Sequence, residues 1–371
     1  MKIKFLDLYA QSKEIRNKIL YSIKKNIKNS NFINGEDVQK FEKTFAKYLS
    51  IKFCLGVANG TDALEIAIKS LNLPKNSEFI VPANTWISTA ESVLNTENKL
   101  KFVDCDNTHN ICIKDLSKKI TRNTKAIIAV HLFGNPANIL KIKKICKKKN
   151  IKLIEDCAQA HGATVNKKKI STFGDVSTFS FFPSKNLGCF GDGGAIVTNN
   201  KKIYLNCKKI ANHGGLKKNE HIILGRNSRL DTIQASILLI KLTKLKKWLI
   251  IRKAQSDFYK KNLAFVGDIE LVKQNENTEQ SNHLFVIRTK KRDKLKKFLE
   301  KKNIQTGIHY PKTLPELKIF KKNHMSYCRH MNSILYKKQI LSLPIGEHLK
   351  INHLKYVCRN IKKFFKNEKI S

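Results

Sequence analysis

The chain has 371 residues, of which 41% are hydrophobic, so it is globular and long enough for one large domain and a smaller one. The formal net charge is +43, but lysines spread from end to end carry it, whereas nucleic-acid readers cluster arginine with aromatic residues on one face. Nine cysteines without a C-x-x-C pair favour free thiols in a reducing cytoplasm over a disulfide framework or a zinc site.

The first 50 residues predict two helices. Isoleucines recur every four residues from Ile15 to Ile27, and a second apolar pattern runs from Val38 to Tyr48. Charged residues interrupt the apolar ones every few positions at the N-terminus, so neither a signal peptide nor a membrane span is expected. We therefore expect an arm that precedes the main domain of a cytoplasmic protein.

Residues 52–199 alternate between predicted strands and helices. The apolar runs are 53–58, 78–82, 101–105, 126–132, 151–155 and 176–182, and amphipathic or polar stretches separate them. Such alternation predicts a mainly parallel, twisted sheet with helices on both faces. No G-x-G-x-x-G motif follows a strand, so a dinucleotide-binding fold is disfavoured.

The stretch from Thr178 to Thr198 predicts a strand, a tight glycine-rich loop and a second strand. Its sequence is TFSFFPSKNLGCFGDGGAIVT, and the loop carries Lys185. Apolar and aromatic walls lower the pKa of a lysine, which makes its amine a nucleophile towards a carbonyl. A surface lysine in a turn is the alternative, so the case for Lys185 depends on its neighbours.

Two other strand ends supply those neighbours. The strand 151–156 ends on Asp156, a carboxylate that can hold a proton on a ring nitrogen, and Gln159 follows it. A helix predicted to start near Thr61 follows the strand 53–58 and Gly60, and free N–H groups at such a start can bind phosphate. Pyridoxal phosphate requires a site that binds its phosphate, a partner for its ring nitrogen and an amine that reacts with its carbonyl group.

The chain resembles the DegT/DnrJ/StrS family of sugar aminotransferases over roughly residues 5–345. The matching segments, in family order, are ANGTDAL from Ala58, VPANTWIST from Val81, KAIIAVHLFGNPA from Lys125, IEDCAQAHGA from Ile154, TFGDVSTFSFFPSKNLGCFGDGGAIVTN from Thr172, NHGG from Asn212 and GRNSRLDTIQAS from Gly225. The resemblance implies the fold-type I aminotransferase architecture, with a three-layer α/β large domain, a mainly parallel sheet and a smaller C-terminal α+β domain. We expect the N-terminal arm and large domain over residues 1–250 and the small domain over 251–371.

The resemblance also implies the residues that hold pyridoxal 5'-phosphate. Lys185 binds the cofactor covalently, Trp86 stacks on its ring, Asp156 holds the ring nitrogen and Gln159 faces the ring. Ser180, Gly60 and Thr61 bind the phosphate, and Asn227 reaches the cofactor of the neighbouring subunit. The resemblance therefore also implies a homodimer in which the two subunits share the active sites. No metal is expected, and His131 and His161 receive no chemical role.

The C-terminal unit is predicted to combine strands and helices. Phe285–Ile287 and 340–344 are predicted strands, 295–299 part of a helix, and GIHYP at 307–311 a strand end. In the family this last segment borders the substrate pocket, which implies that His309 and Tyr310 bind substrate. A second histidine that often follows that tyrosine is missing from PKTLPELK, so the substrate assignment stays open.

The implied activity is transamination from an amino acid, by resemblance glutamate, to a nucleotide-linked keto-deoxyhexose. A dTDP- or UDP-sugar is expected, with C3 favoured over C4, for surface polysaccharide or amino-sugar biosynthesis. Neither nucleic acid nor membrane is an expected partner.

Three alternatives stay open. The first is the related branch that dehydrates or deoxygenates sugars, whose members have histidine where Lys185 stands. The second is a cysteine desulfurase, which would need Cys157 or Cys189 as a mobile thiol. The third is a DNA-binding regulator, suggested by charge alone.

Overall fold

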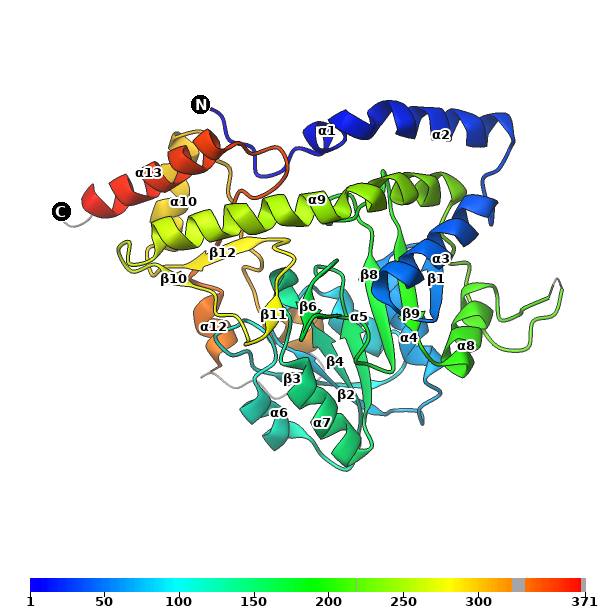
Figure 1. The fold of residues 1–371 in the computed structure, drawn as a ribbon. Helices are drawn as coiled ribbons and strands as arrows, with labels where there is room; N and C mark the ends of the chain where they lie inside the picture. Colours follow the sequence, from blue (N-terminus) through cyan, green and yellow to red (C-terminus); the bar gives the residue numbers. More distant parts are fainter. Residues whose placement is uncertain (218, 322–330, 368–371) are drawn as a thin grey trace.

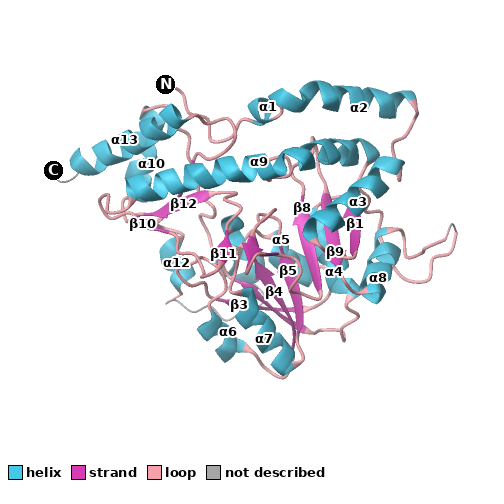
Figure 2. Cartoon of the chain, viewed as in Figure 1, coloured by secondary structure: helices cyan, strands magenta, loops and turns pink. Residues whose placement is uncertain are grey.

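A seven-stranded sheet forms the centre of the large domain, in the order β1-β9-β8-β5-β4-β2-β3 (Figures 1 and 2). The computed structural model describes residues 1–217, 219–321 and 331–367, so Cys328 lies outside the described residues. The strands are β1 (Phe53–Val57), β2 (Glu78–Pro82), β3 (Lys99–Val103), β4 (Thr124–Val130), β5 (Lys152–Asp156), β8 (Val176–Ser180) and β9 (Gly194–Thr198). Neighbours from β8 to β3 pair in parallel, and β9 runs antiparallel to β1 and β8. The mainly parallel sheet predicted from the apolar runs is confirmed.

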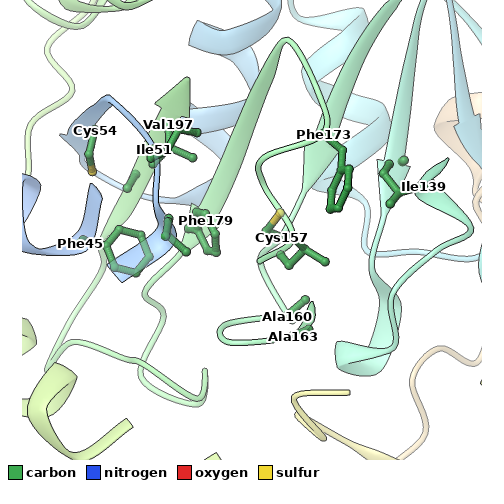
Figure 3. Packing of buried hydrophobic residues seen from close by; sticks show 14 of the residues in the cluster. Phe45, Ile51, Cys54, Ile139, Cys157, Ala160, Ala163, Phe173, Phe179 and Val197 are labelled. Atoms are coloured by element: carbon green, nitrogen blue, oxygen red, sulfur yellow. The ribbon is translucent and has the colours of Figure 1, made fainter. Parts of the chain in front are cut away.

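Helices cover both faces of this sheet because alternate strand residues point to opposite sides. In β4, Ile127 and Ala129 belong to one buried cluster, whereas Ala126 and Ile128 belong to another. The first face is covered by α3 (Glu36–Leu49), α6 (Ile113–Lys119), α7 (Ile139–Lys149) and α9 (Thr232–Leu263), and the second by α4 (Gly60–Ser70), α5 (Ser88–Leu94) and α8 (Lys201–Ala211). Figure 3 shows Phe45 and Phe179 meeting in the first cluster. The three-layer architecture is thereby confirmed.

The small domain is built around a three-stranded sheet of β10 (Glu270–Leu271), β12 (Phe285–Arg288) and β13 (Ile340–Leu343). Its helices are α10 (Arg292–Lys301), α12 (Asn332–Tyr336) and α13 (Ile351–Asn367), with the short α11 (Lys318–Lys321) beside them. The long helix α9 extends from the large domain to this core, where Tyr259 and Leu263 are buried (Figure 1). The predicted boundary after residue 250 falls inside α9, and the division at that residue stays a prediction.

The N-terminal segment packs along α9 rather than extending away from it. It forms α1 (Leu8–Gln11) and α2 (Arg16–Lys28), and Ile15 and Ile19 are buried against Ile237 and Trp248 (Figure 1). Ile15, Ile19 and the partly buried Ile23 therefore form the face that meets α9, whereas Ile27 is exposed. Among residues 1–217, 219–321 and 331–367, none of the helices has the length and apolar character that crossing a lipid bilayer requires.

A strap over residues 273–284 ties the small domain to the loop that follows β4. Ser281 N–H donates to the carbonyl of Gly134 (2.9 Å), and Leu284 N–H donates to that of Phe133 (3.2 Å). Within the strap, β11 (Thr278–Glu279) pairs with β6 (Thr164–Val165), which pairs with β7 (Lys168–Lys169). The strap therefore brings residues far apart in the sequence to the carboxyl ends of β4 and β5.

Several element boundaries differ from the sequence prediction. The prediction started β3 at 101 and β4 at 126, but β3 begins at Lys99 and β4 at Thr124. Polar residues at the starts of these strands interrupt the apolar run without ending the strand. The segment 307–311 was also wrong as a strand end, since within it only Gly307 pairs, in an isolated bridge with Ser342.

Candidate active site

The expected phosphate-binding residues meet where α4 begins. Asn59 caps the helix by accepting a hydrogen bond from Asp62 N–H (2.8 Å), so Gly60 and Thr61 are its first residues. Their own N–H groups have no hydrogen-bond partner among the described residues, as expected at a helix start. A Cβ atom at Gly60 would lie 2.8 Å from Cβ of Ser180, so only glycine allows this approach. The start of α4 and the end of β8 thus form one cradle for an anion.

A second helix start adjoins this cradle. The hydroxyl oxygens of Thr61 and Ser88 lie 2.7 Å apart, and Ser88 is the first residue of α5. Ser88 lies within the motif ANTWIST, but sequence reasoning assigned it no role. The pairing fixes the direction in which the Thr61 side chain points.

Asp156 ends β5 in a buried position, with 5% of its surface exposed. Its Oδ1 accepts a hydrogen bond from Ala158 N–H (3.1 Å), and its Oδ2 accepts one from the Thr89 hydroxyl (3.0 Å). Burial raises the pKa of Asp156, whereas these two bonds and the charge of Lys185 lower it. Thr89 was missed by sequence reasoning because a threonine on a helix gives no signal until the strand end beside it is known.

Lys185 lies in the loop between β8 and β9, and its amine has no hydrogen bond or ion pair among the described residues. The backbone N–H of Lys185 donates to the carbonyl of Phe182 (2.9 Å), and this hydrogen bond closes a turn. Burial lowers the pKa of the Lys185 amine to about 8, against the opposing influence of Asp156. The two groups are therefore close enough to influence each other's ionisation, and the amine is neutral far more often than an exposed lysine.

Two side chains on one face of α9 hold the loop that carries Lys185. Lys241 is buried and donates from Nζ to the carbonyl of Gly188 (2.6 Å), while Gln234 accepts from Phe190 N–H (2.9 Å) and donates to its carbonyl (3.3 Å). Burial lowers the pKa of Lys241 to about 8. Neither residue was anticipated, because seven-residue spacing on a helix does not reveal which loop the helix supports.

Trp86 and Tyr310 form an aromatic pair that Gln159 contacts. The rings of Trp86 and Tyr310 are 5.4 Å apart and tilted by 44°, and Trp86 is 56% exposed. The side chain of Gln159 donates to the Tyr310 hydroxyl (3.1 Å) and accepts from Phe133 N–H (2.7 Å). Burial raises the pKa of Tyr310 to about 12, so this hydroxyl keeps its proton. Trp86, Gln159 and Tyr310 therefore come together, as their expected roles require.

His309 and Asn227, two other expected site residues, contact neither Lys185 nor Asp156 through a hydrogen bond. Nδ1 of His309 lies 2.9 Å from the Ser342 hydroxyl, and its ring stacks on Phe5 at 5.8 Å. Asn227 is exposed and lines a cavity of about 620 Å³ together with Asn59. Its side chain forms no hydrogen bond with the part of the chain that the structure describes, which leaves the amide open to another molecule.

The buried cluster of His131, Glu155 and Cys157 is held by hydrogen bonds. Nδ1 of His131 accepts from Ala137 N–H (3.1 Å), so Nε2 carries the proton and donates to Glu155 (3.1 Å). Glu155 also accepts from the N–H groups of Ser171, Phe173 and Gly174. These hydrogen bonds hold the segment before β8 in place. Both ring nitrogens of His131 already form hydrogen bonds within the protein.

Comparison with known proteins gives the family. The model for the DegT/DnrJ/EryC1/StrS aminotransferase family matches residues 13–362. The chain is 36% identical to the "Pleiotropic regulatory protein" of Geobacillus stearothermophilus over 370 residues, covering 99% of this chain and 100% of that one. It is 34% identical to dTDP-3-amino-3,4,6-trideoxy-alpha-D-glucose transaminase of Streptomyces venezuelae over 349 residues, covering 94% and 92%.

Solved structures agree with the family model. S. venezuelae DesV aligns with a TM-score of 0.95 at 33% identity, covering 98% of this chain and 99% of that one. NtdA from Bacillus subtilis, solved with bound cofactor PMP, aligns with a TM-score of 0.92 at 27% identity, covering 98% and 85%.

The residues at the strand ends fit pyridoxal phosphate on chemical grounds. The open N–H groups of Gly60 and Thr61 suit the phosphate, the buried carboxylate of Asp156 suits a protonated ring nitrogen, and the free amine of Lys185 suits the aldehyde. The match covers nearly the whole chain, and the predicted enzyme class and cofactor are confirmed. The chain belongs to the DegT/DnrJ/EryC1/StrS aminotransferase family and is a pyridoxal phosphate-dependent aminotransferase.

Proposed function

We propose that this enzyme transfers an amino group from glutamate to the keto carbon of a nucleotide-linked deoxyhexose, with C3 favoured over C4. The transaminase of S. venezuelae to which it is 34% identical is named for a dTDP-linked 3-amino sugar, which supports the substrate class and the carbon. The observation that carries the proposal is the unpaired Lys185 amine, with a pKa of about 8, beside the buried carboxylate of Asp156.

Lys185 and Asp156 would share the proton chemistry. When bound, pyridoxal phosphate supplies an electron sink for the carbon that gains or loses the amino group. Lys185 holds the cofactor and, once free, moves the proton at that carbon through Nζ. Asp156 keeps the proton on the ring nitrogen, and the bonds from Thr89 and Ala158 hold its carboxylate in the necessary direction.

The remaining cofactor contacts follow from the two helix starts and the aromatic pair. Gly60, Thr61 and Ser180 would bind the phosphate, and Trp86 would cover the ring. Gln159 faces the ring from a position fixed by its bonds to Tyr310 and Phe133.

The active site is proposed to be shared between two copies of the chain. The amide of Asn227 is exposed and unpaired among the described residues, which suits a contact to the cofactor phosphate of the other subunit. A homodimer would then contain two sites, each built from both subunits.

The nucleotide sugar would enter past Tyr310 and His309. The tyrosine hydroxyl is held by Gln159 and the imidazole by Ser342, so both offer fixed polar groups at the edge of the site. The formal charge of +43 favours an anionic dTDP- or UDP-sugar, because a positive field raises its local concentration. The product would serve surface polysaccharide or amino-sugar biosynthesis in the cytoplasm.

One assay tests this proposal. Holoenzyme is incubated with L-glutamate and a dTDP-linked 3-keto-6-deoxyhexose, and 2-oxoglutarate and the amino sugar are measured, with Lys185→Ala as the control. We expect both products in equal amounts from the wild type and neither from the variant. If the enzyme aminates a 4-keto sugar alone, the proposed position of amination changes from C3 to C4. If a sugar hydroxyl is lost without amination, the enzyme is a dehydratase and not a transaminase.

A further inference from the structure

Three imidazoles lie close enough to Lys185 for its charge to affect their ionisation. Burial, and then the charge of Lys185, lower the pKa of His161 to about 3, that of His309 to about 4 and that of His283 well below its ordinary value. All three rings are therefore neutral at physiological pH, and each has one nitrogen with a proton and one with a lone pair. Their hydrogen bonds decide which of them can act on a ligand.

His161 is closed off from the site. Both of its ring nitrogens are buried, and its ring packs against Phe179 (5.2 Å) and Phe181 (5.8 Å). His161 is therefore part of the aromatic wall behind Lys185.

The tautomer of His283 is fixed by Asn186, the residue after Lys185. The Nδ2 group of Asn186 donates to the carbonyl of Ser281 (2.8 Å), and because a carbonyl can only accept, the orientation of this amide is determined. Its Oδ1 then lies 3.2 Å from Nδ1 of His283. Since Oδ1 can only accept, Nδ1 carries the proton and Nε2 of His283 carries the lone pair.

That lone pair is available. Nε2 of His283 has no hydrogen-bond partner among the described residues, and 9% of the residue is exposed. The backbone behind it is held firmly, because the carbonyl of His283 accepts from Arg252 (3.3 Å), whose guanidinium is paired with Glu347 at 2.7 Å. His283 thus presents a fixed acceptor next to the loop that carries Lys185.

We propose that His283 is a substrate-binding residue, whose Nε2 accepts a hydrogen bond from a donor group of the bound substrate. A neutral acceptor excludes a carboxylate or phosphate oxygen at this position, since two acceptors would face each other. The donor is therefore a sugar hydroxyl or the ammonium group of the amino acid. The identity of the donor rests on the proposed transamination. The tautomer of His283 follows from its hydrogen bond to Asn186 and is independent of that proposal.

Two variants separate the two ring nitrogens. In His283→Asn, the side-chain amide reaches the position of Nδ1 and can still donate to Asn186, but nothing replaces Nε2. In His283→Gln, the longer side chain places an amide oxygen near the position of Nε2. Each holoenzyme is mixed with L-glutamate, or with dTDP-3-amino-3,4,6-trideoxyglucose, and the change in cofactor absorbance is followed over a single turnover.

The expected result is a selective loss in His283→Asn. It should keep the wild-type cofactor spectrum and melting temperature but need about tenfold more substrate for half-maximal rate, the factor that corresponds to about 1.4 kcal/mol. His283→Gln should recover part of that loss. A loss with L-glutamate would assign the donor as the ammonium group, and a loss confined to the amino sugar would assign it as a hydroxyl.

Other outcomes overturn the assignment. If His283→Asn matches the wild type with both compounds, Nε2 binds no substrate, and if both variants lose stability or cofactor, the role of His283 is structural. The ¹⁵N chemical shifts of histidine-labelled holoenzyme test the tautomer without any substrate, and a proton on Nε2 would contradict it. Should wild-type enzyme convert neither compound, the proposed substrates fail, while the ¹⁵N result still decides whether His283 presents an acceptor.

Discussion

The hydroxyl of Thr89, on α5, donates a 3.0 Å hydrogen bond to Oδ2 of Asp156 at the end of β5. This bond favours the ionised carboxylate against the effect of burial. Thr89→Val should therefore lower kcat on the order of tenfold, since a hydrogen bond to a charged group contributes about 1.5–3 kcal/mol. Thr89→Ser keeps the hydroxyl and should stay within about threefold of the wild type by the same estimate. Equal rates in all three proteins would show that the bond does not orient Asp156.

The pKa of Lys185 predicts how the cofactor-free enzyme captures pyridoxal phosphate. Only the neutral amine attacks an aldehyde, and burial lowers the pKa of this amine to about 8, so the capture rate should rise as pH increases through about 8. Asp156 raises the pKa of Lys185, so Asp156→Asn should move the midpoint to lower pH. Stopped-flow absorbance measures both profiles. A midpoint near the ordinary value for lysine would mean that the amine is solvated.

Glu155 should contribute to stability rather than to chemistry. Although burial opposes ionisation, the bonds from His131 and from the backbone of 171–174 lower the pKa of Glu155. Its stabilising effect is thus complete above the ordinary carboxylate pKa and is lost as pH falls through the lowered value. Glu155→Gln should reduce the free energy of unfolding at pH 7 by about 3 kcal/mol.

The matched control for this change is Glu36→Gln. Glu36 pairs with Lys40 on an exposed helix face, so its replacement should change stability by less than about 0.5 kcal/mol. Urea unfolding at pH 7 and pH 4 measures both variants. If Glu155→Gln unfolds like the wild type at pH 7, the carboxylate does not hold the segment before β8.

A shared active site predicts complementation between two inactive variants. Lys185→Ala lacks the amine and should lose about 10²–10⁴-fold in activity, while Asn227→Ala should bind cofactor weakly. A mixed dimer of the two contains one site with both Lys185 and Asn227 intact. Co-expression with two affinity tags isolates that dimer, and its activity should exceed that of either variant. Activity no greater than that of Asn227→Ala alone would mean that each subunit supplies its own site.

The sequence predicted most of the sheet because parallel strands are buried on both faces and read as apolar runs. It also predicted the start of α4 to within one residue, since Gly60 precedes a clear helical pattern. Residues such as Lys185 and Asp156 could be proposed because the chemistry requires their types near strand ends.

The supporting residues could not be found in this way. Thr89, Lys241 and His283 contact segments distant in the sequence, and neither their residue types nor their spacing indicates these contacts. The short strands β6, β7, β10 and β11 have two residues each, too few for a period-two pattern. Tertiary packing, not local propensity, determines these features.

The most direct test of the central claim locates the cofactor on the chain. Holoenzyme is reduced with borohydride, which makes the bond between the cofactor aldehyde and its lysine permanent, and the digested peptides are analysed by mass spectrometry. The pyridoxyl group should be found on Lys185, and Asp156→Asn should weaken cofactor binding without moving the label. A label on any other lysine, such as the buried Lys241, would contradict the account.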